Sequence, residues 1–529
     1  MDKQLLSGNE AVALAAFDCG VNLGCGYPGT PSSEILAEFS RLGGSAEWEP
    51  NEKCALETAV GVALAGGRAL VTMKHVGLNV AADPFFTIAY SGTPGGLVVI
   101  SADDPGMASS QNEQDNRRYA IAAGVPMFEP ADSQECYDFL CGAFALADSF
   151  RSPVLFRMTT RVCHSKCVVE RRKKSPDALR SGTFTVDPKS NVMIPAFARL
   201  AHKRLRADLG AMRAINEKNE FNKIECRSSE LGIIASGVSY QHAREAAPEA
   251  SILKLGFTHP LPEKTIRDFA AKVRRLVVVE EGDPVLADAV CSLGVTVDRA
   301  EEVFRFGELN VDRVRKLLAH DASEDPAPSV APRPPQLCPG CPHRKTFETL
   351  RDLGCIVSGD IGCYTLGVMP PFNAIHSCVC MGASVTVGLG LRKMLPEKEA
   401  RRVVSVIGDS TFFHTGINGI VEMVYNAPGT GHLVIVLDNR TTAMTGMQEN
   451  PGTGRKLDHT TPAPRLSIEE IVRGIGVDFV ATVDSTAEPE KFSALVAECL
   501  AANRTSVVVV RRSCVIAAVR ERQRENGAK

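Results

Sequence analysis

The stretch "VVSVIGDSTFF", residues 403–413, is the part of the sequence that decides the fold. Its apolar run at 403–408 predicts a buried strand, and "GINGIVEMVYN" at 416–426 has the apolar spacing of an amphipathic helix. Gly408 allows a turn between the two, so Asp409 falls at the carboxyl end of a strand, where α/β sheets bind their ligands. The stretch therefore predicts an α/β unit with an acid at its ligand-binding edge.

A second predicted strand ends in the same way. "HLVIVLDN", residues 432–439, is apolar until it reaches Asp438 and Asn439. If the two strands are neighbours, a carboxylate and an amide oxygen come together, and Mg²⁺ prefers such oxygen ligands when it shares its shell with phosphates. The alternative is that Asp409 caps the following helix and Asn439 makes a turn. The pattern thus predicts a magnesium diphosphate site, with capping as the open alternative.

The alternation of strand and helix patterns extends along most of the chain. β-rich runs such as "GGLVVIS" (95–101) alternate with helical patterns such as residues 51–66, which is typical of a parallel sheet. The sequence predicts an α/β protein with multiple doubly wound parallel-sheet domains. The expected divisions are residues 1–185 for a first large domain, 186–225 for a helical connector, 226–322 for a smaller α/β domain, 323–336 for a Pro-rich linker, 337–520 for a second large domain and 521–529 for a tail.

The composition of the 529 residues, with 44% hydrophobic and 23% charged, is that of a soluble globular protein. A formal net charge of −3 gives no reason to expect nucleic acid as a partner. The first residues lack the basic start and apolar core of a signal peptide, and no apolar run approaches the roughly 18 residues of a membrane helix. We therefore expect a cytoplasmic protein with no membrane partner, whose 17 cysteines stay reduced.

One pair of cysteines has the spacing of metal ligands. In "LCPGCPHR" (337–344), two residues separate Cys338 from Cys341, so both thiolates can bind from a single turn. Zinc would need two more ligands, and so would a [4Fe–4S] cluster. The candidates are Cys363 and Cys514, with Cys378, Cys380 and His343 as alternatives.

The two strand ends together resemble the thiamin diphosphate motif. "GDS" at 408–410 is followed, after residues 411–437, by "DN", although Ser410 stands where many family members have Gly. The resemblance implies that Gly408, Asp409 and Ser410 contact the cofactor. It also implies that Asp409 and the Asn439 side chain hold Mg²⁺, with the Thr441 backbone carbonyl as a third ligand.

Thiamin enzymes also need a buried glutamate that promotes the imino tautomer of the pyrimidine. "NEKCALETAVGVALAGG" (51–67) is similar to the family's arrangement, and Glu52 occupies the matching position, with Glu57 as the alternative. "TMKHVGLN" (72–79) resembles the loop that lines the pyrimidine pocket. His75 there is expected to assist protonation or contact substrate, or to be structural.

The chain as a whole resembles the 2-oxoacid:ferredoxin oxidoreductases, most closely the large (alpha) subunit of the indolepyruvate enzymes. The resemblance covers nearly the whole chain, and its motifs occur in order: "GYPGTPSSEI" (26–35), "SADDPGMASSQNEQDNR" (101–117), "LCPGCPHR" (337–344), "GDIGCYTLG" (359–367) and "LDNRTTAMTGMQENPGTG" (437–454). It implies a pyrimidine-binding domain at 1–185, a transketolase C-terminal-like domain at 226–322 and a diphosphate-binding domain at 337–520.

The same resemblance implies the activity and further site residues. A 2-oxoacid, by analogy an aryl pyruvate, is oxidatively decarboxylated to an acyl-CoA, with electrons leaving through one [4Fe–4S] cluster to ferredoxin or another acceptor. Cys338, Cys341, Cys363 and Cys514 match the cluster ligands. Thr30 is expected to contact the substrate carboxylate, and Arg117 is a candidate second contact, with an exposed surface arginine as its alternative.

Two alternatives to this function remain: a non-oxidative thiamin decarboxylase or carboligase, in which the cysteines bind zinc or are structural, and a scaffold subunit with a relic site. The chain ends at "RERQRENGAK" without the ferredoxin-like cysteine runs of the indolepyruvate large subunit. We therefore expect at most one cluster and a separate electron acceptor. A small gamma- or beta-type partner subunit and a homodimer within a heterotetramer are also expected.

Overall fold

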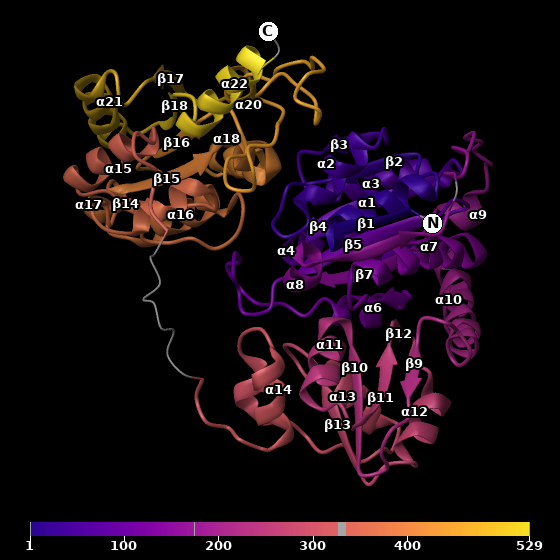
Figure 1. Ribbon diagram of the computed structural model, residues 1–529. Coiled ribbons are helices and arrows are strands. Elements are labelled where there is room, and N and C mark those ends of the chain that lie inside the picture. Colours follow the sequence, from indigo (N-terminus) through magenta and orange to yellow (C-terminus); the bar gives the residue numbers. More distant parts are fainter. Residues whose placement is uncertain (1, 174, 326–334, 528–529) are drawn as a thin grey trace. The chain divides into compact units, whose positions relative to one another are not determined.

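The computed structural model describes residues 2–173, 175–325 and 335–527, and the chain falls into two compact units, Met1–Ala327 and Pro328–Lys529 (Figure 1). Most of the Pro-rich linker expected at 323–336 lies outside the described residues. Among the residues described, no helix is both long enough and apolar enough to cross a membrane.

The first unit is built on a seven-stranded sheet with the order β12-β6-β7-β5-β4-β2-β3. All neighbouring strands are parallel except β12, which runs antiparallel to β6. Its strands are β2 (Leu23–Gly26), β3 (Ala46–Trp48), β4 (Ala69–Lys74), β5 (Leu97–Asp103), β6 (Met127–Phe128), β7 (Val154–Thr159) and β12 (Phe257–His259).

This sheet has a hydrophobic core on each face, because successive side chains of a strand point to opposite faces. Leu70 and Val98 pack on one side with α1 and α7, whereas Val71 and Val99 pack on the other with α3 and α5. The helices of this part are α1 (Gly8–Asp18), α2 (Ser33–Arg41), α3 (Glu52–Leu64), α4 (His75–Val80), α5 (Ala82–Ser91), α6 (Arg117–Ala123), α7 (Ser133–Phe150) and α8 (Thr160–His164). The sheet is therefore doubly wound.

The remainder of the first unit contains two smaller sheets. β1 (Asp2–Ser7) pairs with β8 (Lys166–Arg171), and a four-stranded sheet has the order β13-β10-β11-β9. The long helix α10 (Pro195–Asn216) leads into this second sheet (Figure 1). The other elements are α9 (Pro188–Asn191), β9 (Lys223–Glu225), β10 (Leu231–Ser236), α11 (Gly237–Ala246), β11 (Ser251–Leu255), α12 (Glu263–Ala270), β13 (Arg275–Val279), α13 (Val285–Ser292), η1 (Glu302–Arg305) and α14 (Val311–Leu318).

The second unit is a five-stranded parallel sheet with the order β14-β15-β16-β18-β17, covered by helices on both faces. Its strands are β14 (Ile356–Ser358), β15 (Val403–Gly408), β16 (His432–Asp438), β17 (Phe479–Val483) and β18 (Thr505–Arg511). Its helices are α15 (His343–Asp352), η2 (Cys363–Val368), α16 (Ala383–Met394), α17 (Glu397–Ala400), α18 (Asp409–Thr411), α19 (Ile417–Tyr425), α20 (Ile468–Ile475), α21 (Pro489–Ala501) and α22 (Val515–Gly527).

A π-helical turn, η3 (Phe412–Gly416), lies between α18 and α19. The helix predicted at 416–426 thus begins directly after a segment of wider winding, which itself follows the acid at the end of β15. π-helical turns are rare and occur frequently at functional sites.

Candidate functional site

The edge of the second sheet brings together the two strand ends that the sequence singles out. β15 and β16 are adjacent and parallel, with Val404–Gly408 paired to Leu433–Leu437. Asp409 and Asn439 therefore follow neighbouring strands at the same edge, where both side chains are buried, with 4% and 8% exposed. This agrees with the neighbouring strand ends that the sequence predicts.

The side chain of Asp409 is buried with only one of its two oxygens paired among the described residues. Its Oδ1 accepts a hydrogen bond from the backbone N–H of Ser410 at 2.8 Å, but the buried Oδ2 has no hydrogen-bond partner in the part of the chain that the structure describes. Burial and the nearby Asp438 carboxylate raise the pKa of Asp409 to about 8. Since a buried carboxylate needs a counter-charge, the residues present fit a bound cation with oxygen ligands, such as Mg²⁺.

The amide of Asn439 is fixed in position from two sides. Its Oδ1 accepts from the backbone N–H of Thr441 at 3.2 Å, and its Nδ2 lies 3.3 Å from Nε2 of His343. Burial lowers the pKa of His343 to about 4, so the imidazole is neutral and can accept this hydrogen bond. His343, considered above as a cluster ligand, is therefore in contact with the amide at the strand end.

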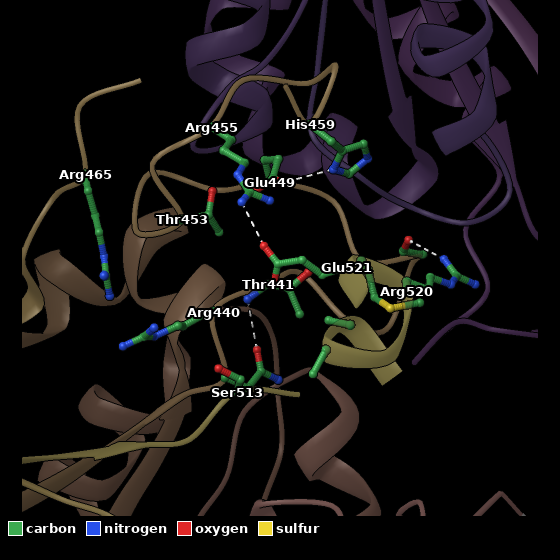
Figure 2. A pocket seen from close by; sticks show the side chains of 15 residues that line it. Arg440, Thr441, Glu449, Thr453, Arg455, His459, Arg465, Ser513, Arg520 and Glu521 are labelled. Atoms are coloured by element: carbon green, nitrogen blue, oxygen red, sulfur yellow. Dashed lines mark hydrogen bonds and ion pairs between the residues drawn. The ribbon is translucent and has the colours of Figure 1, made fainter. Parts of the chain in front are cut away.

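A cavity of about 280 Å³ lies beside this edge, and most of its charged side chains are basic (Figure 2). Arg455 pairs with Glu521 of α22 at 2.7 Å, and His459 pairs with Glu449 at 2.7 Å. Three further arginines line the cavity without a carboxylate partner within 4 Å among the described residues. They are Arg440, Arg465 and Arg520.

This excess of positive charge suits a diphosphate, because guanidinium groups match phosphate oxygens in geometry and charge. These arginines are not among the site residues predicted from the sequence. They come from the loop after β16 and from the C-terminal helix, so no local spacing marks them as a group.

The four cysteines predicted as cluster ligands lie close enough to influence one another. Burial and the neighbouring cysteines raise the pKa of Cys341 and of Cys363 to about 11, and for both thiols the neighbours include Cys338 and Cys514. No three Cys, His, Asp or Glu side chains of the described residues are arranged to hold a single metal ion. In a [4Fe–4S] cluster each cysteine binds a different iron, so its sulfurs lie farther apart than around one ion. Four thiols that influence one another are the chemical type of donor that such a cluster requires.

The two alternative cysteines, Cys378 and Cys380, lie near Asp360 and not with the four predicted ligands. Cys378 and Cys380 are exposed, and the charges that act on Cys378 are those of Asp360 and Cys380 rather than those of the four cysteines above. Asp360 is itself held by the backbone N–H groups of Gly382 and Ser384, at 2.9 and 3.0 Å. Because Cys378 and Cys380 lie apart from the other thiols, the structure favours the four predicted cysteines as the ligand set.

In the first unit, the predicted catalytic glutamate lies at the start of α3. The Asn51 side chain caps this helix by accepting from the backbone N–H of Cys54, and Glu52 is only 5% exposed. Its carboxyl group packs directly on Gly77 of α4, where an added Cβ would lie 2.6 Å from Oε1. Glu57, by contrast, is exposed and pairs with Lys53. Of the two candidates, Glu52 alone is a buried carboxyl.

His75 begins α4, two residues before the glycine that Glu52 contacts. It is completely buried, and its Nε2 lies 3.1 Å from the carbonyl of Asn112. Its Nδ1 is buried without a hydrogen-bond partner among the residues described. The amide of Asn116 donates to the His75 carbonyl at 2.9 Å and so anchors this turn. The structure thus brings His75 and Glu52 to the same region.

The two predicted substrate contacts have different surroundings. Thr30 is half-buried in the loop after β2. Arg117 is 2% exposed, and its guanidinium donates to Asp115 at 2.9 Å and to Glu280 at 2.6 Å. Nη2 also donates to the carbonyl of Asp283 at 2.9 Å. Arg117 is therefore not a surface arginine, and acids from two parts of the unit already balance its charge.

Comparison with known proteins identifies both halves of the chain. Residues 14–193 match the family described as "Pyruvate flavodoxin/ferredoxin oxidoreductase, thiamine diP-bdg", and residues 360–510 match "Thiamine pyrophosphate enzyme, C-terminal TPP binding domain". The solved 2-oxoglutarate:ferredoxin oxidoreductase from Magnetococcus marinus superimposes with a TM-score of 0.51 at 16% identity, over 60% of this chain and 65% of that one. This likeness concerns the fold.

Relatives with the same name from several organisms match almost the whole chain. The indolepyruvate oxidoreductase subunit IorA of Methanothermobacter thermautotrophicus is 40% identical, over 97% of this chain and 87% of its own length. The subunit of the same name from Archaeoglobus fulgidus is 39% identical, over 99% of this chain and 88% of its own length. Identity of this extent covers both units described above.

Proposed function

This chain belongs to the family of IorA subunits of indolepyruvate oxidoreductase, and from that premise we propose that it oxidatively decarboxylates an aryl pyruvate, such as indolepyruvate, to an acyl-CoA. It is an oxidoreductase of the thiamin diphosphate-dependent 2-oxoacid:ferredoxin type. The observation that carries the proposal is the partnerless Oδ2 of Asp409 at the paired ends of β15 and β16.

The edge of the second sheet would hold the diphosphate end of the cofactor. Asp409, the Asn439 side chain and the Thr441 carbonyl would bind Mg²⁺, while Gly408 and Ser410 would contact the diphosphate. The basic cavity beside them supports this assignment, since it offers guanidinium groups to phosphate oxygens. The role of Mg²⁺ would be to anchor the diphosphate.

The first unit would hold the pyrimidine end. Bound thiamin diphosphate supplies a nucleophilic carbon and an electron sink for decarboxylation. Glu52 would hydrogen-bond the pyrimidine ring nitrogen and move a proton there, a task that suits a buried, positioned carboxyl. His75 would assist protonation through its partnerless Nδ1, and Thr30 would contact the substrate carboxylate.

Electrons would leave through one [4Fe–4S] cluster bound by Cys338, Cys341, Cys363 and Cys514, to ferredoxin or another acceptor. The mutual electrostatic influence of these thiols supports this assignment. The relatives are named as subunits, which supports a multi-subunit enzyme. We propose a homodimer of this chain that joins a small gamma- or beta-type subunit in a heterotetramer, with coenzyme A as co-substrate.

The test begins with iron and acid-labile sulfide in the anaerobically purified chain and its partner subunit. About four irons per chain, and bleaching of the iron–sulfur absorption when an aryl pyruvate, thiamin diphosphate, Mg²⁺ and coenzyme A are present, would support the proposal. Release of CO₂ without bleaching and without acyl-CoA would assign a non-oxidative decarboxylase instead. No CO₂ from any 2-oxoacid would remove the proposed function.

A further inference from the structure

Arg117 is buried among acids that already balance its charge. A second cation in the first unit is therefore needed to pair with the proposed substrate carboxylate. We propose that Lys74 binds the carboxylate of the 2-oxoacid through its ammonium group. This inference rests on the proposed function and adds to it a residue that determines specificity for an acid over a neutral carbonyl compound.

Lys74 lies where a ligand of this sheet is expected. It is the last residue of β4, at the carboxyl end of a parallel strand, and it directly precedes His75. The stem of its side chain packs against Gly29, where an added Cβ would lie 3.0 Å from the Lys74 Cβ. Gly29 is next to Thr30, the residue expected to contact the same carboxylate. The lysine therefore lies against the proposed substrate loop.

The ammonium group has neutral partners and a donor to spare. Nζ donates to the Ser109 carbonyl at 2.8 Å and lies 3.3 Å from the Ser109 hydroxyl. An ammonium has three N–H donors, so one is left for a ligand. No carboxylate of the described residues lies within the 4 Å of an ion pair with Lys74. The half-buried cation thus lacks a counter-anion that a substrate would supply.

The acid whose charge acts on Lys74 is Asp104, in the loop after β5. Neutral donors hold it instead of the lysine: it accepts from the backbone N–H of Ser109 at 2.8 Å and from the Thr160 hydroxyl at 2.8 Å. His75, on the other side, turns its Nε2 to the Asn112 carbonyl. These groups leave the ammonium free of a direct ion pair.

Burial lowers the pKa of Lys74 to about 8, and the Asp104 charge only partly opposes this effect. A bound carboxylate would stabilise the ammonium form, so the ligand and the proton bind together. The affinity for a carboxylate is therefore expected to fall as the pH rises above about 8. A lysine that only anchored the loop would not link ligand binding to pH in this way.

The experiment compares two ligands that the enzyme cannot turn over. Indolepropionate keeps the carboxylate of the substrate but lacks the keto group, and indolepropionamide is its neutral counterpart. Binding of each is measured by calorimetry to the full-length protein with thiamin diphosphate and Mg²⁺, across pH 6.5 to about 9. Lys74→Gln keeps an N–H donor for Ser109 but loses the charge, and Lys74→Arg keeps the charge.

We expect K74Q to lower the affinity for indolepropionate by about tenfold or more and to change the affinity for indolepropionamide by less than about twofold. The pH dependence of indolepropionate binding should disappear in K74Q. K74R should retain most of the affinity. Lys166→Gln, which removes an exposed lysine paired with Glu10 at 3.4 Å, is the control and should change nothing. Equal losses for both ligands, or no loss for either, would overturn the proposal.

Turnover of indolepyruvate tests the proposed function independently of the role of Lys74. If wild-type protein oxidises indolepyruvate and K74Q has the same KM, the function stands and Lys74 is not the carboxylate ligand. If the wild-type protein oxidises no 2-oxoacid, the proposed function fails, whatever the lysine does with indolepropionate. An increase in KM with little change in kcat is the expected result, because the carboxylate contact serves binding.

Discussion

The backbone N–H of Cys514 donates a hydrogen bond to the carbonyl of Asn439 at 3.0 Å. The side chain of the same asparagine meets His343, which lies two residues after Cys341. The strand end expected to bind the metal is thus tied on two sides to segments that carry predicted cluster ligands. The residues proposed to bind the cofactor and those proposed to bind the cluster therefore share one scaffold within the second unit.

Replacing His343 with Leu would remove the acceptor for the Asn439 Nδ2 without removing a thiol. We expect the iron content to be unchanged and the affinity for thiamin diphosphate with Mg²⁺ to fall about tenfold, because an unpaired buried donor costs roughly 1–3 kcal/mol. Metal analysis and cofactor titration measure the two effects. Loss of iron with unchanged cofactor binding would instead make His343 a cluster ligand.

Cys514→Ser should abolish the cluster, because one of its four thiolates is lost. The expected iron content drops from about four per chain toward zero. Cys378→Ser is the matched control: this exposed thiol lies with Cys380 and Asp360, and its loss should leave the iron in place. The assignment of the four ligands fails if C378S loses the iron and C514S keeps it.

Glu52→Gln should keep the fold and the cofactor but lower turnover by about 10² or more, the usual contribution of a positioned acid–base group. Glu57→Gln, at an exposed position five residues along the same helix, should leave turnover within about twofold. Steady-state rates at saturating thiamin diphosphate compare the two. The reverse ranking would transfer the role to Glu57.

Much of the fold and of the candidate site could be predicted from the sequence. The features that could not be predicted have one cause in common, which is contact between distant segments. The strands at 403–408 and 432–439 stand out because buried parallel strands are continuous apolar runs. Residues 2–7 form β1, and no local pattern marks this strand because its pairing with β8 depends on a segment about 160 residues away.

The burial of Arg117 had no local signal either. Its partner Asp115 is two residues away, but Glu280 follows β13 in the smaller sheet, so only the folded chain brings the acids around the guanidinium. The basic cavity also had no local signal in the sequence, because its arginines are spread from residue 440 to residue 520. Sequence patterns predict strand ends well, whereas charge clusters assembled from distant segments need the structure.

Gly77→Ala tests the contact between α4 and Glu52, the proposed catalytic glutamate. The new Cβ would lie 2.6 Å from Oε1 of Glu52, so the carboxyl must move, and we expect a loss of turnover of about tenfold or more. Gly61→Ala is the control, since nothing lies within 4 Å of its Cβ and it sits within α3. That change should stabilise the protein by about 0.5–1 kcal/mol with full activity, measured by melting and by rate.

Glu281 predicts a dependence of stability on pH. Burial raises its pKa to about 7. A carboxyl with a raised pKa favours the folded state most below its unfolded value, and this contribution is lost as the pH rises through about 7. Between pH 5 and about 8, we expect the wild type to lose up to roughly 3 kcal/mol more free energy of unfolding than Glu281→Gln. The melting temperature of the wild type should therefore fall more steeply over this range. Parallel curves for the two proteins would contradict this.

The π-helical turn at Phe412–Gly416 has a consequence for how this sequence can vary. Because it follows α18 and continues into α19, it fixes the rotation of the acid at Asp409 relative to the apolar face of the later helix. A π-helical turn holds about one residue more than an α-helical turn, so removing one residue there would restore ordinary winding and leave the facing of the following helix almost unchanged. Homologous sequences are therefore expected to absorb a one-residue change in length at this turn, whereas the same change inside α19 would rotate its apolar face by about 100°.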